Sequence, residues 1–238
     1  MKFNLICSDN PWNFSDQLNK GGKVKRGASS NYSTLTTQDL INLPVKDIAA
    51  DNSILALWTP SSLLQDGLNV MSAWGYTQKQ TYIWVKNKKF SLELLKSKIF
   101  SIFTKGIEFD TVVDEIAGAL DSFDLNEVLA FGMGRLFRQT HEIALIGTRG
   151  KVYNMLENKS QRSVCFDSVL KHSAKPEHLQ DRLDIMFPDP TLNRLEMFAR
   201  RERKGWNCIG NELSSSILHS SSFLGEDIRD AIERLKNV

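Results

Sequence analysis

Residues 9 to 12 have the clearest chemical potential in the chain: an acid, an amide, a proline and an aromatic residue stand in sequence as Asp9, Asn10, Pro11 and Trp12. Pro11 stiffens the backbone and favours an extended conformation at Asn10, which can hold the Asn10 carbonyl beside the Asp9 carboxylate. Two such acceptors can bind both hydrogens of an exocyclic amino group, and Trp12 offers a face for stacking on a base. The alternative is a turn that ends a strand, with a packed tryptophan.

Two further clusters carry groups suited to a charged or polar ligand. Lys175 directly precedes the expected start of a helix, a place that favours a carboxylate, although a solvated loop would look the same. Glu196 lies in an expected strand that Arg200 ends, and this pair suits the hydroxyls of a ribose. Asn211 and Glu212 add polar groups for a nucleoside. Each cluster alone is ordinary strand-to-loop sequence.

The elements that must position these residues alternate between strands and helices. Apolar runs predict strands at 3–8, 53–58, 81–85, 141–146, 162–166 and 193–198, and helical spacing predicts helices at 37–48, 61–74, 176–187 and 221–235. Residues 205–213 are expected to cross back over the sheet. The alternation predicts an α/β fold, in which ligands bind at the carboxyl ends of the strands. A site is therefore expected directly after the strand at 3–8.

Two stretches interrupt this alternation. Residues 88–130 show helical spacing without strands, which predicts a helical insertion. A packed elaboration is its simplest role, and oligomerisation or target binding is the alternative. Residues 13–31 form a long polar loop, and long loops in compact domains are usually functional or mobile. Its basic residues are suited to phosphate contacts beside the site, or are simply solvated: Lys20, Lys23, Lys25 and Arg26.

Composition narrows the class of protein. The chain has 238 residues, 41% of them apolar and 24% charged, with a net charge of +2, and this composition excludes disordered and fibrous classes. The length suits one large domain or two small ones, and a single domain over 1–238 is expected. Three separated cysteines and four histidines argue against a disulfide framework and a zinc site, and favour a reducing compartment. Cys165 and Cys208 are expected to be small buried residues. No apolar stretch approaches the ~20 residues that span a bilayer, so a cytoplasmic location is expected.

Several short motifs follow one another along the chain in a particular order. They are Asp9–Trp12, Tyr32–Thr36, Leu43-Pro44, Leu57–Thr59, Trp74–Tyr76, Trp84–Lys86, Gly132–Arg138, Glu142, Gly147–Gly150, His172–Pro176, Glu196–Arg200, Gly205-Trp206 and Gly210–Glu212. This series resembles the MT-A70 family of adenine-N6 methyltransferases. The resemblance covers about 2–86 and 131–213, and leaves out the helical insertion and a C-terminal helical tail at about 214–238.

The resemblance implies a Rossmann-like methyltransferase sheet with helices on both faces and S-adenosylmethionine as the methyl donor. It assigns catalysis to Asp9, Asn10, Pro11 and Trp12, with the target amine held at Asp9 and the Asn10 carbonyl. It assigns the cofactor to Asp9, Lys175, Arg200, Asn211 and Glu212, with Lys175 on the methionine carboxylate. No metal is required. The expected substrate is adenine in DNA, as in the phage and bacterial enzymes, and a homo- or heterodimer is open.

One departure from the family pattern bears on activity. Asn10 stands where the family usually has proline. The backbone carbonyl survives this change, but some rigidity is lost. Asn10 therefore leaves open a catalytically silent nucleic-acid-binding subunit of a methyltransferase complex. Independently of Asn10, the four motif residues do not exclude an RNA adenine methyltransferase or a cytosine-N4 enzyme.

Overall fold

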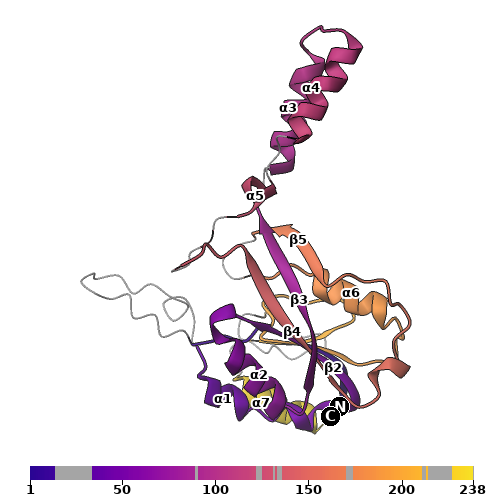
Figure 1. Cartoon of the computed structure of the whole chain (residues 1–238). Coiled ribbons are helices and arrows are strands. Elements are labelled where there is room, and N and C mark those ends of the chain that lie inside the picture. Colours follow the sequence, from indigo (N-terminus) through magenta and orange to yellow (C-terminus); the bar gives the residue numbers. More distant parts are fainter. Residues whose placement is uncertain are drawn as a thin grey trace, which may run out of the picture. The chain divides into compact units, whose positions relative to one another are not determined.

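The structure is a computed structural model, which describes residues 1–13, 34–88, 91–121, 125–130, 132, 136–169, 174–210, 213 and 227–237. Its strands are β1 (Phe3–Ser8), β2 (Ala49–Thr59), β3 (Thr77–Asn87), β4 (His141–Arg149), β5 (Val164–Ser168), β6 (Arg194–Met197) and β7 (Asn207–Ile209). Its helices are α1 (Thr37–Ile41), α2 (Leu64–Ala73), α3 (Ser91–Phe103), α4 (Phe109–Asp121), α5 (Leu125–Val128), α6 (His178–Met186) and α7 (Ile228–Lys236) (Figure 1).

The strands form one sheet in the order β5-β3-β4-β2-β1-β6-β7. β1 pairs in parallel with both β2 and β6, and β6 pairs in parallel with β7. β5 is parallel to β3, whereas β4 is antiparallel to β2. Strands and helices alternate around this sheet, so the α/β, Rossmann-like fold expected from the sequence is confirmed.

The chain divides into two compact units, which are described separately. The first comprises Met1–Tyr82, Ile143–Ser163 and Glu177–Val238, and contains β1, β2, β6 and β7. The second comprises Ile83–Glu142 and Val164–Pro176, and contains β5 and the helices α3, α4 and α5.

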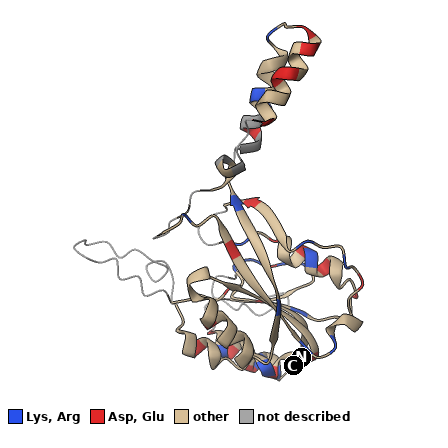
Figure 2. Cartoon of the chain, in the orientation of Figure 1, with Lys and Arg blue, Asp and Glu red and all other residues tan. Residues whose placement is uncertain are grey.

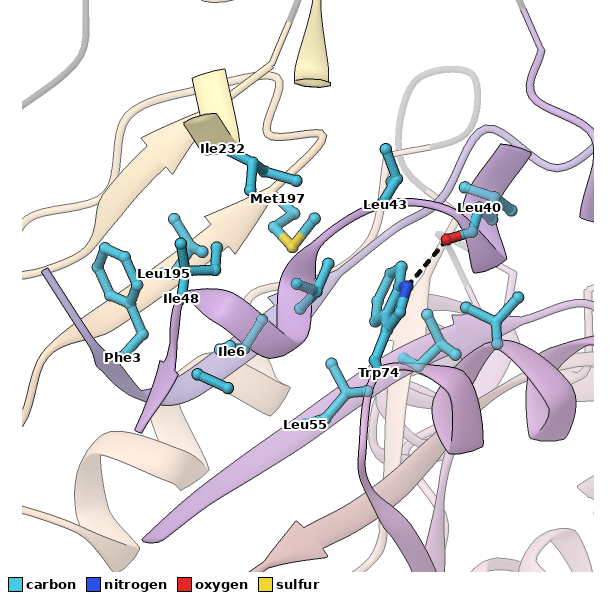
Figure 3. Packing of buried hydrophobic residues seen from close by; sticks show 14 of the residues in the cluster. Phe3, Ile6, Leu40, Leu43, Ile48, Leu55, Trp74, Leu195, Met197 and Ile232 are labelled. Atoms are coloured by element: carbon cyan, nitrogen blue, oxygen red, sulfur yellow. Dashed lines mark hydrogen bonds between the residues drawn. The ribbon is translucent and has the colours of Figure 1, made fainter. Parts of the chain in front are cut away.

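The core of the first unit lies between one face of the sheet and the helices α1, α2 and α7 (Figure 3). Leu195 and Met197 of β6 point into this cluster, so the alternation of the strand turns Glu196 to the opposite face. Trp74, fully buried at the end of α2, donates its indole N–H to the Leu40 carbonyl of α1 at 2.9 Å. Gly75 follows with φ +86°, and thus ends the helix where the sequence predicted.

Most predicted elements occur, and the differences have physical causes. Within 205–213, which the sequence predicted to cross over the sheet, Asn207–Ile209 instead extend it as β7, parallel to β6, with Cys208 and Ile209 buried on its two faces. The helix predicted at 37–48 ends at Ile41, before Pro44, and a short 3-10 turn follows at Val45–Asp47. α7 begins only at Ile228, where the Asp227 side chain caps it.

The predicted helices of 88–130 occur as α3, α4 and α5. Much of the predicted C-terminal tail, residues 214–226, lies outside the described residues. The assignment of the whole chain to a single domain stays a prediction. Among the helices that the structure describes, none has the length and apolar character needed to cross a membrane.

Candidate functional site

The turn after β1 lies at an edge of the sheet where three parallel strands end. Ser8, the last residue of β1, is in register with Leu57 of β2 and Met197 of β6. The Asp9 N–H donates to the Met197 carbonyl at 3.5 Å, so the turn is held to the end of β6. Asp9 therefore stands at the carboxyl ends of the strands, as the sequence predicted.

Two hydrogen bonds shape the turn around Asn10. The Trp12 N–H donates to the Asn10 backbone carbonyl at 2.9 Å, and the Ser8 hydroxyl donates to Asn10 Oδ1 at 2.6 Å. A carbonyl has two lone pairs, so the Asn10 oxygen can accept a second donor. The Asn10 amide nitrogen is buried and has no hydrogen-bond partner among the described residues. The Asp9 carboxylate next to it is half-buried.

Trp12 is packed inside the core, since only 3% of it is exposed. Its indole N–H donates to the Trp58 carbonyl at the end of β2, at 2.9 Å. Pro11 and Asn13 are tied by backbone hydrogen bonds to Leu35. The Trp12 ring therefore packs in the core, which was the alternative to stacking on a base. The burial of this ring gives no support to the predicted stacking.

The loop after β6 is held tightly against β7 at the same edge. The Ala199 N–H donates to the Ile209 carbonyl at 2.9 Å. A Cβ on Gly210 would lie 2.2 Å from the Ala199 carbonyl oxygen, so only glycine allows this approach. Phe198 has φ +58°, a strained conformation for a residue with a bulky side chain. Half-buried Arg200 comes two residues after Phe198, on the loop that follows Met197, whose carbonyl accepts from the Asp9 N–H.

Arg203, in the basic run after Arg200, is bound by three carboxylates at the start of and within α6. Its guanidinium donates to Glu177, Asp181 and Asp184 at 2.7, 2.7 and 2.9 Å, and so fastens this loop to α6. Burial opposes the charged form, but the hydrogen bonds to the carboxylates outweigh it and raise the pKa of Arg203. This arginine thus positions the loop.

Glu196 is a half-buried acid for which the sequence predicted no defined contact. Its strand neighbours in register are Cys7 of β1 and Cys208 of β7, and Gln180 of α6 hydrogen-bonds its carboxyl group. Burial raises the pKa of Glu196 to about 7, against the opposing effect of that hydrogen bond. Burial also raises the pKa of the Cys7 thiol, so this cysteine packs as a small apolar residue.

In the second unit, Glu142 joins two lysines. Its carboxylate lies 2.5 Å from Lys86 Nζ and 3.1 Å from Lys175 Nζ, and all three side chains are half-buried. Burial alone would raise the pKa of Glu142, but the two lysines outweigh it and lower that pKa. Lys86 also lies over the ring of Trp84, 5.1 Å from its centroid. The two ammonium groups and the one carboxylate together carry a net positive charge.

The predicted site residues thus fall into three groups. The first unit brings Asp9, Asn10, Pro11 and Arg200 to one sheet edge, and buries Trp12 beneath it. Lys175 belongs to the second unit, with Glu142 as a partner that the sequence reasoning missed. Outside the described residues are Lys20, Lys23, Lys25, Arg26, Asn211 and Glu212. Across the part of the chain that is described, no cluster of His, Cys, Asp and Glu is suited to a metal ion.

Comparison with known proteins extends the resemblance read from the motifs. The model of the MT-A70 family matches residues 3–108 and 123–212. The Type II methyltransferase M.MunI of Mycoplasma sp is 23% identical over 226 residues, which are 89% of this chain and 78% of that protein. METTL3 of Danio rerio, an N(6)-adenosine-methyltransferase subunit, is 29% identical over 89% of this chain but only 28% of its own length. METTL4 of Homo sapiens, an N(6)-adenine-specific methyltransferase, is 23% identical over 37% of its length.

Proposed function

The chain belongs to the MT-A70 family, and from that premise we propose that it is a methyltransferase that uses S-adenosylmethionine to methylate the N6 amine of adenine in DNA. The observation that carries the proposal is the turn Asp9–Pro11. It lies at the carboxyl edge of three parallel strands and inside a segment that the family model matches.

The chemistry proposed for this turn is the activation of a weak nucleophile. The lone pair of an adenine amine is delocalised into the ring, so attack requires the nitrogen to become pyramidal. The Asp9 carboxylate and the second lone pair of the Asn10 carbonyl would accept the two N–H bonds in that geometry. They would also stabilise the positive charge that develops on nitrogen. Alignment of the amine with the methyl group supplies the remaining acceleration.

S-adenosylmethionine supplies a sulfonium methyl group when it is bound. The residues present fit such a ligand: the net positive charge at Lys86, Glu142 and Lys175 suits a carboxylate. The loop that carries Arg200 suits a ribose. Asn211 and Glu212 are proposed as further contacts of the nucleoside.

Coverage of the relatives favours DNA over RNA as the substrate. The match to the bacterial Type II methyltransferase runs over most of both chains, whereas METTL3 is matched over about a quarter of its length. A target base in a duplex must leave the stack, at a cost of a few kcal/mol. Phosphate contacts would offset part of this cost, and we assign them to Lys20, Lys23, Lys25 and Arg26.

A catalytically silent nucleic-acid-binding subunit is the second candidate. Asn10 favours it, because its buried amide nitrogen lacks a partner among the described residues at the position where the family usually has proline. The retained Asp9 and Lys175 favour an enzyme.

The deciding experiment is transfer of a labelled methyl group from S-adenosylmethionine to unmodified duplex DNA, with RNA of the same sequence in parallel. Nucleoside digestion and mass spectrometry then identify the product. We expect N6-methyladenine in the DNA. If N6-methyladenine forms only in the RNA, the substrate is RNA and not DNA. If the protein binds the cofactor but forms no product on either nucleic acid, the silent subunit is favoured.

A further inference from the structure

The helices α3 and α4 form a hairpin that buries only one side of each helix. Ile102 of α3 and Val112 of α4 are buried between them, with Ile99 and Ile116 half-buried beside these two. The Lys105 Nζ lies 2.5 Å from a carboxylate oxygen of Glu115, and this ion pair joins the two helices near the tip. The hairpin is thus held together along a single seam.

A second apolar face lies beside this seam and stays exposed. It consists of Phe100 (68% exposed) and Phe103 (58%) of α3 with Phe109 (74%), Val113 (48%) and Leu120 (50%) of α4, called here the hairpin face. Successive helical residues are rotated by about 100°. On each helix, therefore, these residues lie roughly a quarter turn from the residues in the seam. Because the two helices run antiparallel, both exposed stripes turn to the same side of the hairpin.

The charges on the two helices are complementary. α3 carries Lys96 and Lys98 against one acid, Glu93, and Lys105 follows it. α4 carries four acids and no base: Asp110, Asp114, Glu115 and Asp121 (Figure 2). An acidic helix beside the hairpin face repels phosphates, which argues against a nucleic acid as its partner. It attracts a basic helix such as α3 of another copy.

The family pattern does not account for α4. The two segments matched by the family model leave out residues 109–122, which contain this whole helix. A helix that exposes an apolar stripe needs another layer to cover it, and a pair of such helices is completed by a second pair.

We propose that the hairpin face is a self-association surface, at which two copies of this chain join into a dimer through a four-helix bundle. The two-fold axis runs along the helices, so that α3 of one copy packs against α4 of the other, antiparallel to it. This arrangement covers both apolar stripes at once and places each basic helix on an acidic one. It is independent of the proposed enzymatic activity, since it uses none of the residues assigned to the reaction.

The first test is the oligomeric state of the full chain by sedimentation velocity across a micromolar concentration series. We expect a species of twice the 27.0 kDa of one chain. Replacing Phe100→Ser together with Phe109→Ser should weaken the dimer at least about tenfold. The matched control is Leu136→Ser with Phe137→Ser, since both are highly exposed outside the hairpin and should leave the dimer unchanged. A monomeric wild-type chain, or a dimer insensitive to the hairpin variant, overturns the proposal.

A second test addresses the pairing of α3 with α4. One variant carries Lys96→Glu, and the other carries Asp121→Lys, an acid of α4 close in height to Lys96 when Ile102 is level with Val112. Each alone places like charges together at both contacts of its own dimer and should weaken it. A mixture of the two should form the mixed dimer, because both contacts are then again of opposite sign. If each variant dimerises alone as well as the wild type does, the proposed pairing is wrong. Circular dichroism of each variant checks that the helices remain.

Discussion

The turn after β1 and the hairpin of α3 and α4 both carry aromatic residues, but the turn buries its aromatic ring and the hairpin exposes its rings. Trp12 is 3% exposed and donates a hydrogen bond to Trp58, whereas Phe100 is 68% exposed. At the turn, Trp12 packs against apolar residues of the same chain. This packing holds the backbone that carries Asp9 and Asn10. The hairpin leaves its apolar face open. In the two proposals, the residues of the turn are positioned within one chain, whereas the hairpin is completed by a second chain.

The largest effect is expected from Asp9→Asn, which should remove most of the methyl transfer proposed for the turn while leaving the hairpin unchanged. An amide of the same shape keeps the turn but loses the charge that stabilises the developing cation, so methyl transfer should fall about 10³-fold, about 4 kcal/mol of transition-state stabilisation. Cofactor binding should fall far less than transfer, because the other proposed cofactor residues are unchanged, and the oligomeric state should stay the same. Single-turnover transfer to DNA and calorimetric binding of S-adenosylmethionine measure the two quantities.

Asp51→Asn is the matched control. It is the same substitution of an acid by its amide, at a fully exposed side chain outside the proposed site. Its transfer rate should equal that of the wild type. An Asp9→Asn protein that retains full activity would remove Asp9 from the catalytic role.

The second prediction compares two truncations, Trp12→Ala and Phe100→Ala. Trp12 loses core contacts and a hydrogen bond, so its replacement should lower the free energy of unfolding by about 3–5 kcal/mol. Phe100 is exposed on a single chain, so its replacement should change that free energy by less than about 0.5 kcal/mol in dilute protein. Urea unfolding at low protein concentration measures both. Equal losses in the two variants would mean that the two regions are packed alike.

Sequence reasoning predicted the sheet side of this contrast well, because apolar runs bounded by turn residues mark buried strands directly. β1 occurs with the predicted bounds, Phe3–Ser8, and Asp9 follows it at the strand ends. β7 was missed because three residues, Asn207–Ile209, are too few to show a strand pattern. The pairing of β4 antiparallel to β2 is likewise a long-range choice that no local pattern contains.

The candidate site was predicted in its residue types but less well in their surroundings. Trp12 is the same residue whether it stacks on a base or packs in a core, and only its burial separates the two. Glu142 joined the motif series, yet its two lysine partners come from β3 and from the loop before α6, far apart in sequence. The exposure of Phe100 was equally hidden, since helical spacing marks an apolar face without saying what covers it.

Glu196 provides the third prediction, a pH dependence on the sheet side. Its pKa is about 7 in the fold, against an ordinary 4.5. Between these values the folded chain keeps a proton that the unfolded chain releases. The free energy of unfolding should therefore fall as the pH rises through this window, by up to about 3 kcal/mol, and stay level above it. In Glu196→Gln this contribution should be absent, which urea unfolding at about pH 5 and pH 8 tests.

Glu142→Gln serves as the control for this measurement. Its folded pKa is lowered, so its stabilising contribution is present above the ordinary value of 4.5 and is lost only as the pH falls below it. Between about pH 5 and pH 8 its pH dependence should match that of the wild type. If the Glu196→Gln variant has the same pH dependence as well, Glu196 does not hold a proton in the folded chain.

The smallest effect is expected from Asn10→Pro combined with Ser8→Ala, which gives the turn the residue usual in the family. The backbone N–H of Asn10 makes no hydrogen bond among the described residues, so a proline there removes no hydrogen bond from the turn. The pair of changes removes the unpartnered amide nitrogen together with the hydroxyl that bonds Asn10 Oδ1. Unfolding should then require about 1 kcal/mol more free energy. Methyl transfer should stay within a few-fold of the wild type, because the proposed contact uses the backbone carbonyl, which proline retains. A loss of transfer beyond about 100-fold would instead place the Asn10 side chain itself on the substrate.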